Sequence, residues 1–192
     1  MGLSAPELWI LRHGETAWNV EGRLQGHLDS PLTENGYAQA RTQREILRRG
    51  LPRGVTVVSS PSERALETAR IVAEPLGLSV ACDEALREVR VGQWQGRRID
   101  EIAAELPRGA TDDPHLWKFG APGGERIDEM VARLTGLVAR LDGPTVLVTH
   151  GVTSRVLRCL LLGRPPTELS TLPGGQGIVH HVKGGVARVV GA

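Results

Sequence analysis

The sequence predicts an α/β fold built around a mostly parallel sheet. Strand-like runs of β-branched and apolar residues alternate with segments of helical periodicity along the 192 residues, which is the pattern of βαβ units. Hydrophobic residues make up 40% of the chain and charged residues 23%, which is ordinary globular usage. We expect one domain over residues 1–192, because a chain of this length can bury one full-sized core.

The first part of the chain predicts two strands and two helices. The apolar run Glu7–Leu11 predicts the first strand. A helix is expected over Thr33–Arg49, because threonine is a good N-cap and Gly50 suits the helix end. Val55–Ser59 is β-branched and apolar and predicts the second strand. The next helix is expected over Pro61–Leu76, since proline favours a first helical turn.

The middle of the chain is less regular. Ser79–Cys82 predicts a short strand, and residues 92–124 contain one short amphipathic helix near Ile99–Leu106. Apolar residues then recur at helical spacing and predict a helix with one buried stripe: Ile127, Met130, Val131, Leu134, Leu137, Val138 and Leu141.

The last part predicts a central strand and a closing hairpin. Thr145–Thr149 is an apolar run typical of a central strand, and Val152–Leu162 predicts the helix after it. Ile178–Lys183 and Val186–Val190 flank Gly184-Gly185, which is a strong signal for a tight hairpin turn.

Two distant fragments each place a histidine at the end of an apolar run and follow it with glycine. His13-Gly14 follows the first predicted strand, and His150-Gly151 follows the central one. In open α/β sheets ligands bind beyond the carboxyl ends of the strands. If the two strands are neighbours, both imidazoles and the guanidinium of Arg12 meet at one edge, and this combination indicates phosphoryl transfer.

The tripeptide Arg12-His13-Gly14 suits attack on phosphorus. An imidazole can attack only as the neutral ring, with the proton of its other nitrogen held by an acceptor. Arg12 presents a planar fork that matches phosphate oxygens, and Gly14 allows the backbone to bend close to ring and ligand. The alternative is a strand-end histidine bonded to a local carbonyl, beside a surface arginine.

Arg64 is the second candidate cation. Residues 59–69 combine a strand end, a tight turn and a helix start, where free N–H groups and the helix dipole favour anions. Because a cation in a first helical turn calls for a partner anion, we expect Arg64 to reach the same phosphate as Arg12. The alternative is a local pair with Glu67 or Thr68.

Glu88 and His150 complete the candidate catalytic set. A carboxyl group with a raised pKa at Glu88 can protonate a leaving alcohol and later activate water. An imidazolium at His150 can stabilise charge on phosphate oxygens, and the N–H of Gly151 adds a hydrogen bond. The alternatives are a solvated glutamate and a satisfied core histidine.

Amide side chains supply further donors for an anion at Asn19 and at Gln25, which precedes Gly26. The alternative is that both satisfy their own loop backbone.

The glycine-rich pieces at 122–125 and 173–177 lack the context of a phosphate-binding loop and are interpreted as turns. The other histidines divide into two predicted strand residues, His180 and His181, and two weaker candidates for the rim of the site, His27 and His115.

Composition narrows the range of partners. The formal net charge is +1, which gives no electrostatic case for nucleic acid or an anionic membrane. No apolar run reaches the roughly 18 residues of a membrane span, and no secretory signal is visible. Cys82 and Cys159 occur singly in apolar contexts, so we expect buried free thiols and a cytoplasmic protein. No CxxC, HExxH or compact ligand cluster predicts a metal site.

Taken together, these blocks resemble the histidine phosphatase superfamily, in its phosphoglycerate-mutase-like branch. The matching pieces fall in the family's order and span most of the chain: LRHGETAWN (11–19), RLQG (23–26), DSPLTENG (29–36), SSPSERALETA (59–69), LREVRVGQWQG (86–96), PGGER (122–126) and VTHG (148–151). Each piece alone is weak or moderate, but their joint occurrence is highly specific.

The resemblance implies a three-layer α/β/α fold, mostly parallel with an antiparallel edge strand. It implies that His13 is transiently phosphorylated, that Arg12, Arg64 and His150 hold the phosphate, and that Glu88 donates a proton and then activates water. Asn19, Gln25, Gly26 and the backbone of Gly151 would line the pocket. Neither a metal nor another cofactor is expected, because the basic groups neutralise the charge that Mg²⁺ neutralises in kinases.

Three functions share these residues. A phosphatase acting on small phosphomonoesters is favoured over a phosphoglycerate mutase, because the cap segment at about 97–125 is short and mutases of this type exclude water with added segments. A non-catalytic sensor of phosphorylated ligands would be expected to lack a core residue, and none is missing.

Two features bear on the substrate. Trp117, Lys118 and Phe119 are candidates for contacting its non-phosphate part, with an apolar lid anchor as the alternative. Many relatives carry glutamate where this chain has Gln95, a difference that we expect to alter the pocket wall rather than the chemistry. The identity of the substrate and the oligomeric state stay open.

Overall fold

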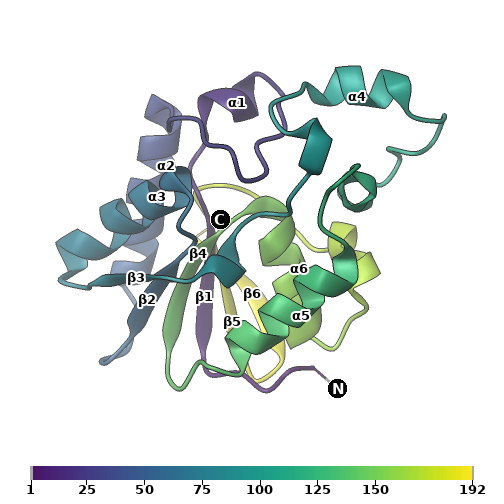
Figure 1. Ribbon diagram of the computed structural model, residues 1–192. Coiled ribbons are helices and arrows are strands. Elements are labelled where there is room, and N and C mark those ends of the chain that lie inside the picture. The colour runs from purple at the N-terminus through teal and green to yellow at the C-terminus, as the bar shows by residue number, and fades with distance from the viewer. Residues whose placement is uncertain (1, 192) are drawn as a thin grey trace.

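The computed structural model describes residues 2–191, which form a six-stranded sheet between two layers of helices (Figure 1). The strands lie in the order β3-β2-β4-β1-β5-β6. The first four of these are parallel, whereas β5 is antiparallel to both β1 and β6. Their bounds are β1 (Leu8–Arg12), β2 (Thr56–Ser59), β3 (Val80–Cys82), β4 (Thr145–Thr149), β5 (Val179–Lys183) and β6 (Val186–Val190).

Each face of the sheet is covered by one pair of long helices. Alternation along β1 sends Trp9 and Leu11 into one apolar cluster with α2 (Glu34–Arg48) and α3 (Glu63–Ala73). Leu8 and Ile10 enter the opposite cluster with α5 (Ile127–Val138) and α6 (Gly151–Leu161). The three-layer α/β/α fold with a mostly parallel sheet is thereby confirmed.

The predicted elements form, with bounds that shift by at most three residues. Thr33 caps α2 by accepting from the N–H of Gly36 at 3.0 Å. The third helix begins at Glu63 rather than Pro61, because Ser62 is still extended. Gly184 and Gly185 both have positive φ, at 55° and 74°, as the hairpin turn requires. The short helix α1 (Ala17–Val20) was not predicted, and α4 (Ile99–Glu105) lies where a short helix was expected.

The sheet brings the two histidine fragments together. Strands β1 and β4 are adjacent and parallel, with Arg12 aligned to Thr149. The N–H of His13 continues the ladder by donating to the carbonyl of Thr149 at 3.0 Å. The residues that follow the two strands therefore emerge at the same edge, beneath α1 and α4 in Figure 1.

One prediction about the cysteines is wrong. Cys159 is buried in α6, but Cys82 is exposed. Its strand, β3, is an edge strand of three residues that pairs only with β2, so the helices do not cover it. Within residues 2–191, the helices are too short or too polar to cross a membrane.

Candidate active site

His13 is a buried, neutral histidine with a defined tautomer. Its Nδ1 lies 2.7 Å from the carbonyl oxygen of Gly14, and because a carbonyl can only accept, Nδ1 carries the proton. Nε2 is then the free base, and Nε of Arg64 donates to it at 3.3 Å. Burial, followed by the charges of Arg64 and Arg12, holds the pKa of His13 well below its ordinary value. The ring is therefore in the form that can attack phosphorus.

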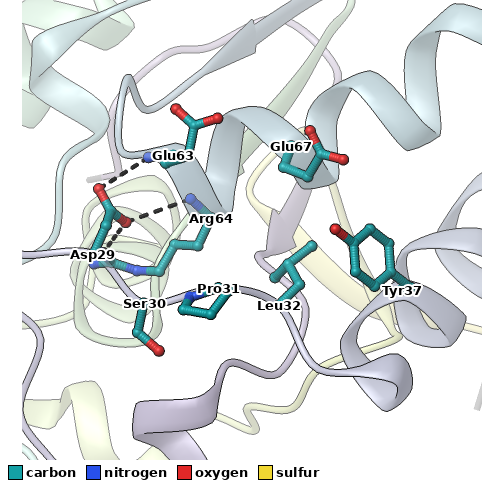
Figure 2. Close-up of a pocket in the computed structure, with 8 residues that line it drawn as sticks. All are labelled: Asp29, Ser30, Pro31, Leu32, Tyr37, Glu63, Arg64 and Glu67. Carbon is teal, nitrogen blue, oxygen red and sulfur yellow. Dashed lines mark hydrogen bonds and ion pairs between the residues drawn. The ribbon is translucent and has the colours of Figure 1, made fainter.

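The buried guanidinium of Arg64 is fixed by the loop that precedes α2. Nη1 donates to Oδ1 of Asp29 at 2.6 Å and to the carbonyl of Leu28 at 2.7 Å. Nη2 donates to the carbonyl of Gly26 at 2.8 Å. The alternative, a local pair of the Arg64 side chain with Glu67 or Thr68, does not form, because Asp29 holds the guanidinium on the other side (Figure 2).

Asp29 also caps α3. Its carboxylate accepts from the N–H of Glu63 at 3.0 Å and from that of Arg64 at 3.4 Å, whereas the N-cap residue Ser62 makes no side-chain cap bond. The helix start therefore binds an anion, as its free N–H groups predict, but this anion is the carboxylate of Asp29. The side chain of Arg64 therefore contributes to the site, while the N–H groups at the start of α3 bind the carboxylate of Asp29.

The guanidinium of Arg12 enters the site without a protein partner. Among residues 2–191 no side chain forms an ion pair with it, and its Nε is buried and unbonded. Gly151 packs on this group, since a Cβ at that position would lie 3.6 Å from Cζ of Arg12. The N–H of Gly151 is at the first position of α6, where the helix has no acceptor for it.

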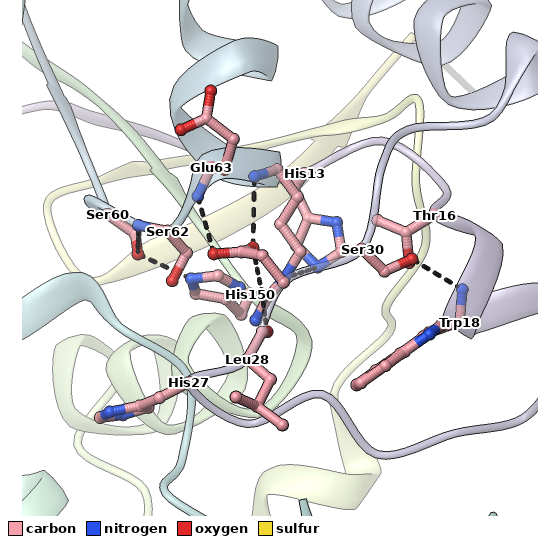
Figure 3. Close-up of polar contacts among 12 residues, drawn as sticks. His13, Thr16, Trp18, His27, Leu28, Ser30, Ser60, Ser62, Glu63 and His150 are labelled. Carbon is pink, nitrogen blue, oxygen red and sulfur yellow. Dashed lines mark hydrogen bonds and ion pairs between the residues drawn. The ribbon is translucent and has the colours of Figure 1, made fainter. Parts of the chain in front are cut away.

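His150 packs edge-on against His13, with ring centroids 5.2 Å apart (Figure 3). Its Nε2 lies 2.8 Å from Oγ of Ser60, and its Nδ1 is buried without a partner. Burial, followed by the charge of Arg64, holds the pKa of His150 well below its ordinary value. The predicted imidazolium is therefore wrong for the free protein. If the Ser60 hydroxyl donates to Nε2, then Nδ1 carries the proton and can donate a hydrogen bond to an anion.

The carboxylate of Glu88 is held by the start of α6. Oε2 accepts from the N–H of Val152 at 3.1 Å, and Oε1 accepts from both the N–H and Oγ1 of Thr153, each at 3.0 Å. Burial raises the pKa of Glu88, but the hydrogen bonds from Val152, Thr153 and Val89 outweigh it, so the pKa is below its ordinary value. The raised pKa assumed from the sequence is wrong for the free protein.

One cavity of about 140 Å³ joins these groups. Arg12, His13, Arg64 and Glu88 line it, together with the predicted binding residues Asn19, Gln25 and Gly26. His150 and Gly151 lie behind this wall, against His13 and Arg12 respectively. The structure thus brings all nine predicted site residues to one place.

The side-chain amides of Asn19 and Gln25 differ in which of their polar atoms lack a hydrogen-bond partner among the described residues. Oδ1 of Asn19 accepts from the N–H of Thr16 and from Nε2 of Gln176, each at 3.2 Å. It therefore caps α1 as the alternative interpretation proposed, while its Nδ2 can still donate into the cavity. Oε1 of Gln25 is buried without a partner.

Residues 117–119 were interpreted either as contacts for the substrate or as an apolar anchor, and the structure supports a different interpretation for different residues. Lys118 lines the cavity. Trp117 packs on Trp94 with centroids 5.4 Å apart, and Phe119 packs on the core, so these two anchor the segment 97–125. Gln95 lies behind the wall, where its Oε1 accepts from the N–H of His27 at 2.8 Å.

Gly14 brings its carbonyl close to the ring of His13, as predicted, and also serves a second purpose. Its φ is not positive, and a Cβ at this position would lie 2.3 Å from the carbonyl oxygen of Gly36. Gly36 in turn would place a Cβ 2.1 Å from the carbonyl oxygen of Glu15. The two glycines therefore allow the loop after β1 to press against the first turn of α2.

Several residues with clear positions were not assigned a role from the sequence. Gln176 donates to the carbonyl of His13 at 3.1 Å from a segment interpreted only as a turn. Asp29, Ser60 and Thr153 hold Arg64, His150 and Glu88. Asp29 and Ser60 lie in two of the sequence blocks that match the family, 29–36 and 59–69, and this match was the only sequence signal for their roles. In residues 2–191, no three His, Cys, Asp or Glu side chains are grouped to hold a metal ion.

Comparisons with known proteins identify the family. The sequence model of the histidine phosphatase superfamily (branch 1) matches residues 8–185. Glucosyl-3-phosphoglycerate phosphatase of Mycobacterium tuberculosis is 38% identical over 191 residues, covering 91% of this chain and 83% of the relative. Probable phosphoglycerate mutase GpmB of Enterobacter sp. is 33% identical, covering 83% of this chain and 76% of the relative.

Solved structures show the same fold. The mycobacterial glucosyl-3-phosphoglycerate phosphatase in complex with VO3 superposes with a TM-score of 0.80 at 36% identity, covering 96% of each chain. A putative alpha-ribazole-5'-P phosphatase from Escherichia coli gives a TM-score of 0.79 at 28% identity, covering 97% of this chain and 95% of that one. The chain belongs to the histidine phosphatase superfamily and is a phosphoric monoester hydrolase.

Proposed function

We propose that the protein hydrolyses small phosphomonoesters through a phosphohistidine on His13, without a metal ion. The observation that carries this proposal is the neutral Nε2 of His13, which Arg64 contacts and which faces a cavity shared with Arg12 and Glu88. An unprotonated nucleophile beside two fixed guanidinium groups matches the needs of phosphoryl transfer.

In the first step, the lone pair on Nε2 of His13 forms a bond to phosphorus and the bond to the ester oxygen breaks. The leaving oxygen takes a proton from Glu88. In the free protein this carboxyl group is ionised, because its pKa is lowered. A phosphate dianion bound in the cavity that Glu88 lines would raise that pKa, since like charges disfavour the ionised form. Substrate binding therefore causes Glu88 to take up a proton from solvent, and departure of the alcohol consumes that proton.

In the second step, water attacks phosphorus, gives its proton to the Glu88 carboxylate, and the N–P bond breaks. The proton on Nδ1 of His13 stays there throughout and is donated in a hydrogen bond to the carbonyl of Gly14, at 2.7 Å in the free protein. This bond stabilises the positive charge that the ring carries while it is phosphorylated. The reaction returns His13 to its neutral form and releases inorganic phosphate.

The cavity supplies positive charge from the chain itself. Within residues 2–191 the guanidinium of Arg12 has no hydrogen-bond or ion-pair partner, and the N–H of Gly151 and Nδ2 of Asn19 are further donors. Such groups can stabilise the equatorial phosphate oxygens as Mg²⁺ does elsewhere. We therefore expect chelation of divalent ions by EDTA to leave the rate unchanged.

A mutase would use the same residues and return the phosphoryl group to another hydroxyl. The short segment 97–125, which we propose acts as a cap, supports hydrolysis, because little chain is available to exclude water from the phosphoenzyme. The relatives' names place phosphoglycerate derivatives among the first substrates to test. We propose a small phosphorylated partner and a cytoplasmic location, supported by the two free thiols and the formal net charge of +1.

The test is release of inorganic phosphate from p-nitrophenyl phosphate and from a panel of phosphomonoesters, with and without EDTA. The proposal predicts turnover that is insensitive to EDTA and abolished by His13→Asn. Isomerisation of phosphoglycerate without phosphate release would indicate a mutase. Activity that His13→Asn retains, or that only a divalent ion restores, contradicts the proposal.

A further inference from the structure

The cavity wall contains a buried lysine that the proposed reaction does not use. Lys118 lines the cavity from the cap segment, and among residues 2–191 no carboxylate forms an ion pair with it. Its Nζ lies 3.5 Å from Nδ1 of His115 and 5.8 Å from the ring centre of Trp117. Burial lowers the pKa of Lys118 to about 8, so it is largely charged near neutral pH.

A second unused cation lies next to Arg12. A Cβ at Gly151 would be 3.6 Å from Cζ of Arg12 and 3.8 Å from Nη1 of Arg155, so the two guanidinium groups flank the same glycine. Nη1 of Arg155 donates to the carbonyl of Gly151 at 3.0 Å, and its Nε is buried without a partner. No ion pair within the described residues involves Arg155.

The nearby carboxylates do not balance these charges. Both oxygens of Glu88 already accept hydrogen bonds from the chain at Val89, Val152 and Thr153. Asp113, which faces His115 and Lys118, accepts from Ser170 and from two backbone N–H groups. Arg12, Lys118 and Arg155 therefore share a partly buried region with one ionised carboxylate inside it.

Like charges held together away from water are costly unless an anion joins them. Arg12, Arg64 and the N–H of Gly151 at the start of α6 are enough to bind the one phosphoryl group that is transferred. Lys118 and Arg155 therefore have no role in binding that group. We propose that Lys118 and Arg155 bind a second anionic group of the substrate, a carboxylate or a second phosphate, carried on its leaving-group side. This inference rests on the proposed function and specifies its substrate class.

The test compares substrates that differ only in this group. 3-Phosphoglycerate carries a carboxylate, glycerol 1,3-bisphosphate a second phosphate, and glycerol 3-phosphate a neutral hydroxyl in its place. We expect the protein to show a higher kcat/KM for at least one doubly anionic substrate than for glycerol 3-phosphate. Comparison of the two doubly anionic substrates with each other identifies which anion is preferred.

Lys118→Gln and Arg155→Gln should each reduce this preference about tenfold or more, because a hydrogen bond to a charged group is lost. They should change kcat/KM for glycerol 3-phosphate by about twofold at most, and Lys118→Arg should keep the preference. Arg188→Gln, an exposed change of the same charge on β6, is the matched control. Equal losses on all three substrates, or a preference for the neutral one in the unmodified protein, would overturn the proposal.

A binding measurement separates this proposal from the proposed function. In the His13→Asn protein, calorimetry with the same three compounds reports the second anion without turnover. Tighter binding of a doubly anionic compound, lost with Lys118→Gln, supports the subsite even if no phosphomonoester is hydrolysed. Equal affinities for all three compounds reject it even if p-nitrophenyl phosphate is hydrolysed rapidly.

Discussion

Nε of Arg64 lies 3.3 Å from Nε2 of His13, the atom that we propose attacks phosphorus. A guanidinium can only donate, so this contact requires an unprotonated Nε2. The carbonyl of Gly14 fixes the proton on the opposite nitrogen. Two groups from different parts of the chain thus select one tautomer of one ring.

The first prediction concerns that tautomer. At about pH 6 a free histidine is mostly protonated, because its ordinary pKa is about 6.5. His13 should remain neutral with its proton on Nδ1, since its pKa is held well below that value. Nitrogen-15 NMR of labelled histidine measures this directly. A resonance for His13 with both nitrogens protonated at this pH would contradict the assignment.

The second prediction tests Asp29 as the residue that positions Arg64. Asp29→Asn keeps an oxygen that can cap α3 but removes the charge paired with Nη1 of Arg64 at 2.6 Å. We expect kcat/KM to fall about 10- to 100-fold, the range set by a charged hydrogen bond, with a small change in the unfolding free energy.

Asp29→Ala is the comparison variant. It removes the cap as well as the charge, so the unfolding free energy should fall by a further ~1 kcal/mol. Denaturant unfolding and steady-state kinetics on both variants separate the two roles. Full activity in Asp29→Asn would show that the guanidinium is held without the carboxylate.

The third prediction tests Glu88 as the proton donor. Glu88→Gln should reduce kcat/KM for an alkyl phosphate about 10²- to 10⁴-fold, the usual contribution of a general acid. The loss should be much smaller for p-nitrophenyl phosphate, because nitrophenolate leaves without a proton. An equal loss on both substrates would assign Glu88 to phosphate binding or structure instead.

The fourth prediction concerns stability at acid pH. His13 and His150 are buried with lowered pKa values, so below about pH 6.5 the unfolded chain binds protons that the folded one does not. The unfolding free energy should therefore fall as pH decreases from about 6.5, by up to about 1.4 kcal/mol per pH unit for each ring. His13→Asn should reduce this slope, as urea titrations across about pH 7.5 to 5 can show. A slope unchanged by the substitution would assign the effect to other groups.

Sequence reasoning placed the strand-end residues correctly for a physical reason. Parallel neighbours end at the same edge of a sheet, so Arg12, His13 and His150 had to meet once β1 and β4 were adjacent. Apolar periodicity likewise located α5 and the closing hairpin, because burial of one face determines both patterns.

The errors concern contacts between segments that no local pattern records. The pKa of Glu88 depends on backbone N–H groups about 65 positions away in α6, and the cap of α3 comes from the loop at Asp29. The neutral state of His150 likewise follows from burial beside Arg64. Such effects depend on how loops pack over the sheet, which residue types alone do not determine.

Rapid-quench labelling tests the central claim most directly. With a ³²P-labelled phosphomonoester, the protein should form a covalent phosphoenzyme that is labile in acid and stable in base, within the time of one turnover. His13→Asn should abolish it, whereas Arg188→Gln should leave it intact. Label that persists in His13→Asn, or turnover of the unmodified protein with no labelled species, would contradict a phosphohistidine at this position.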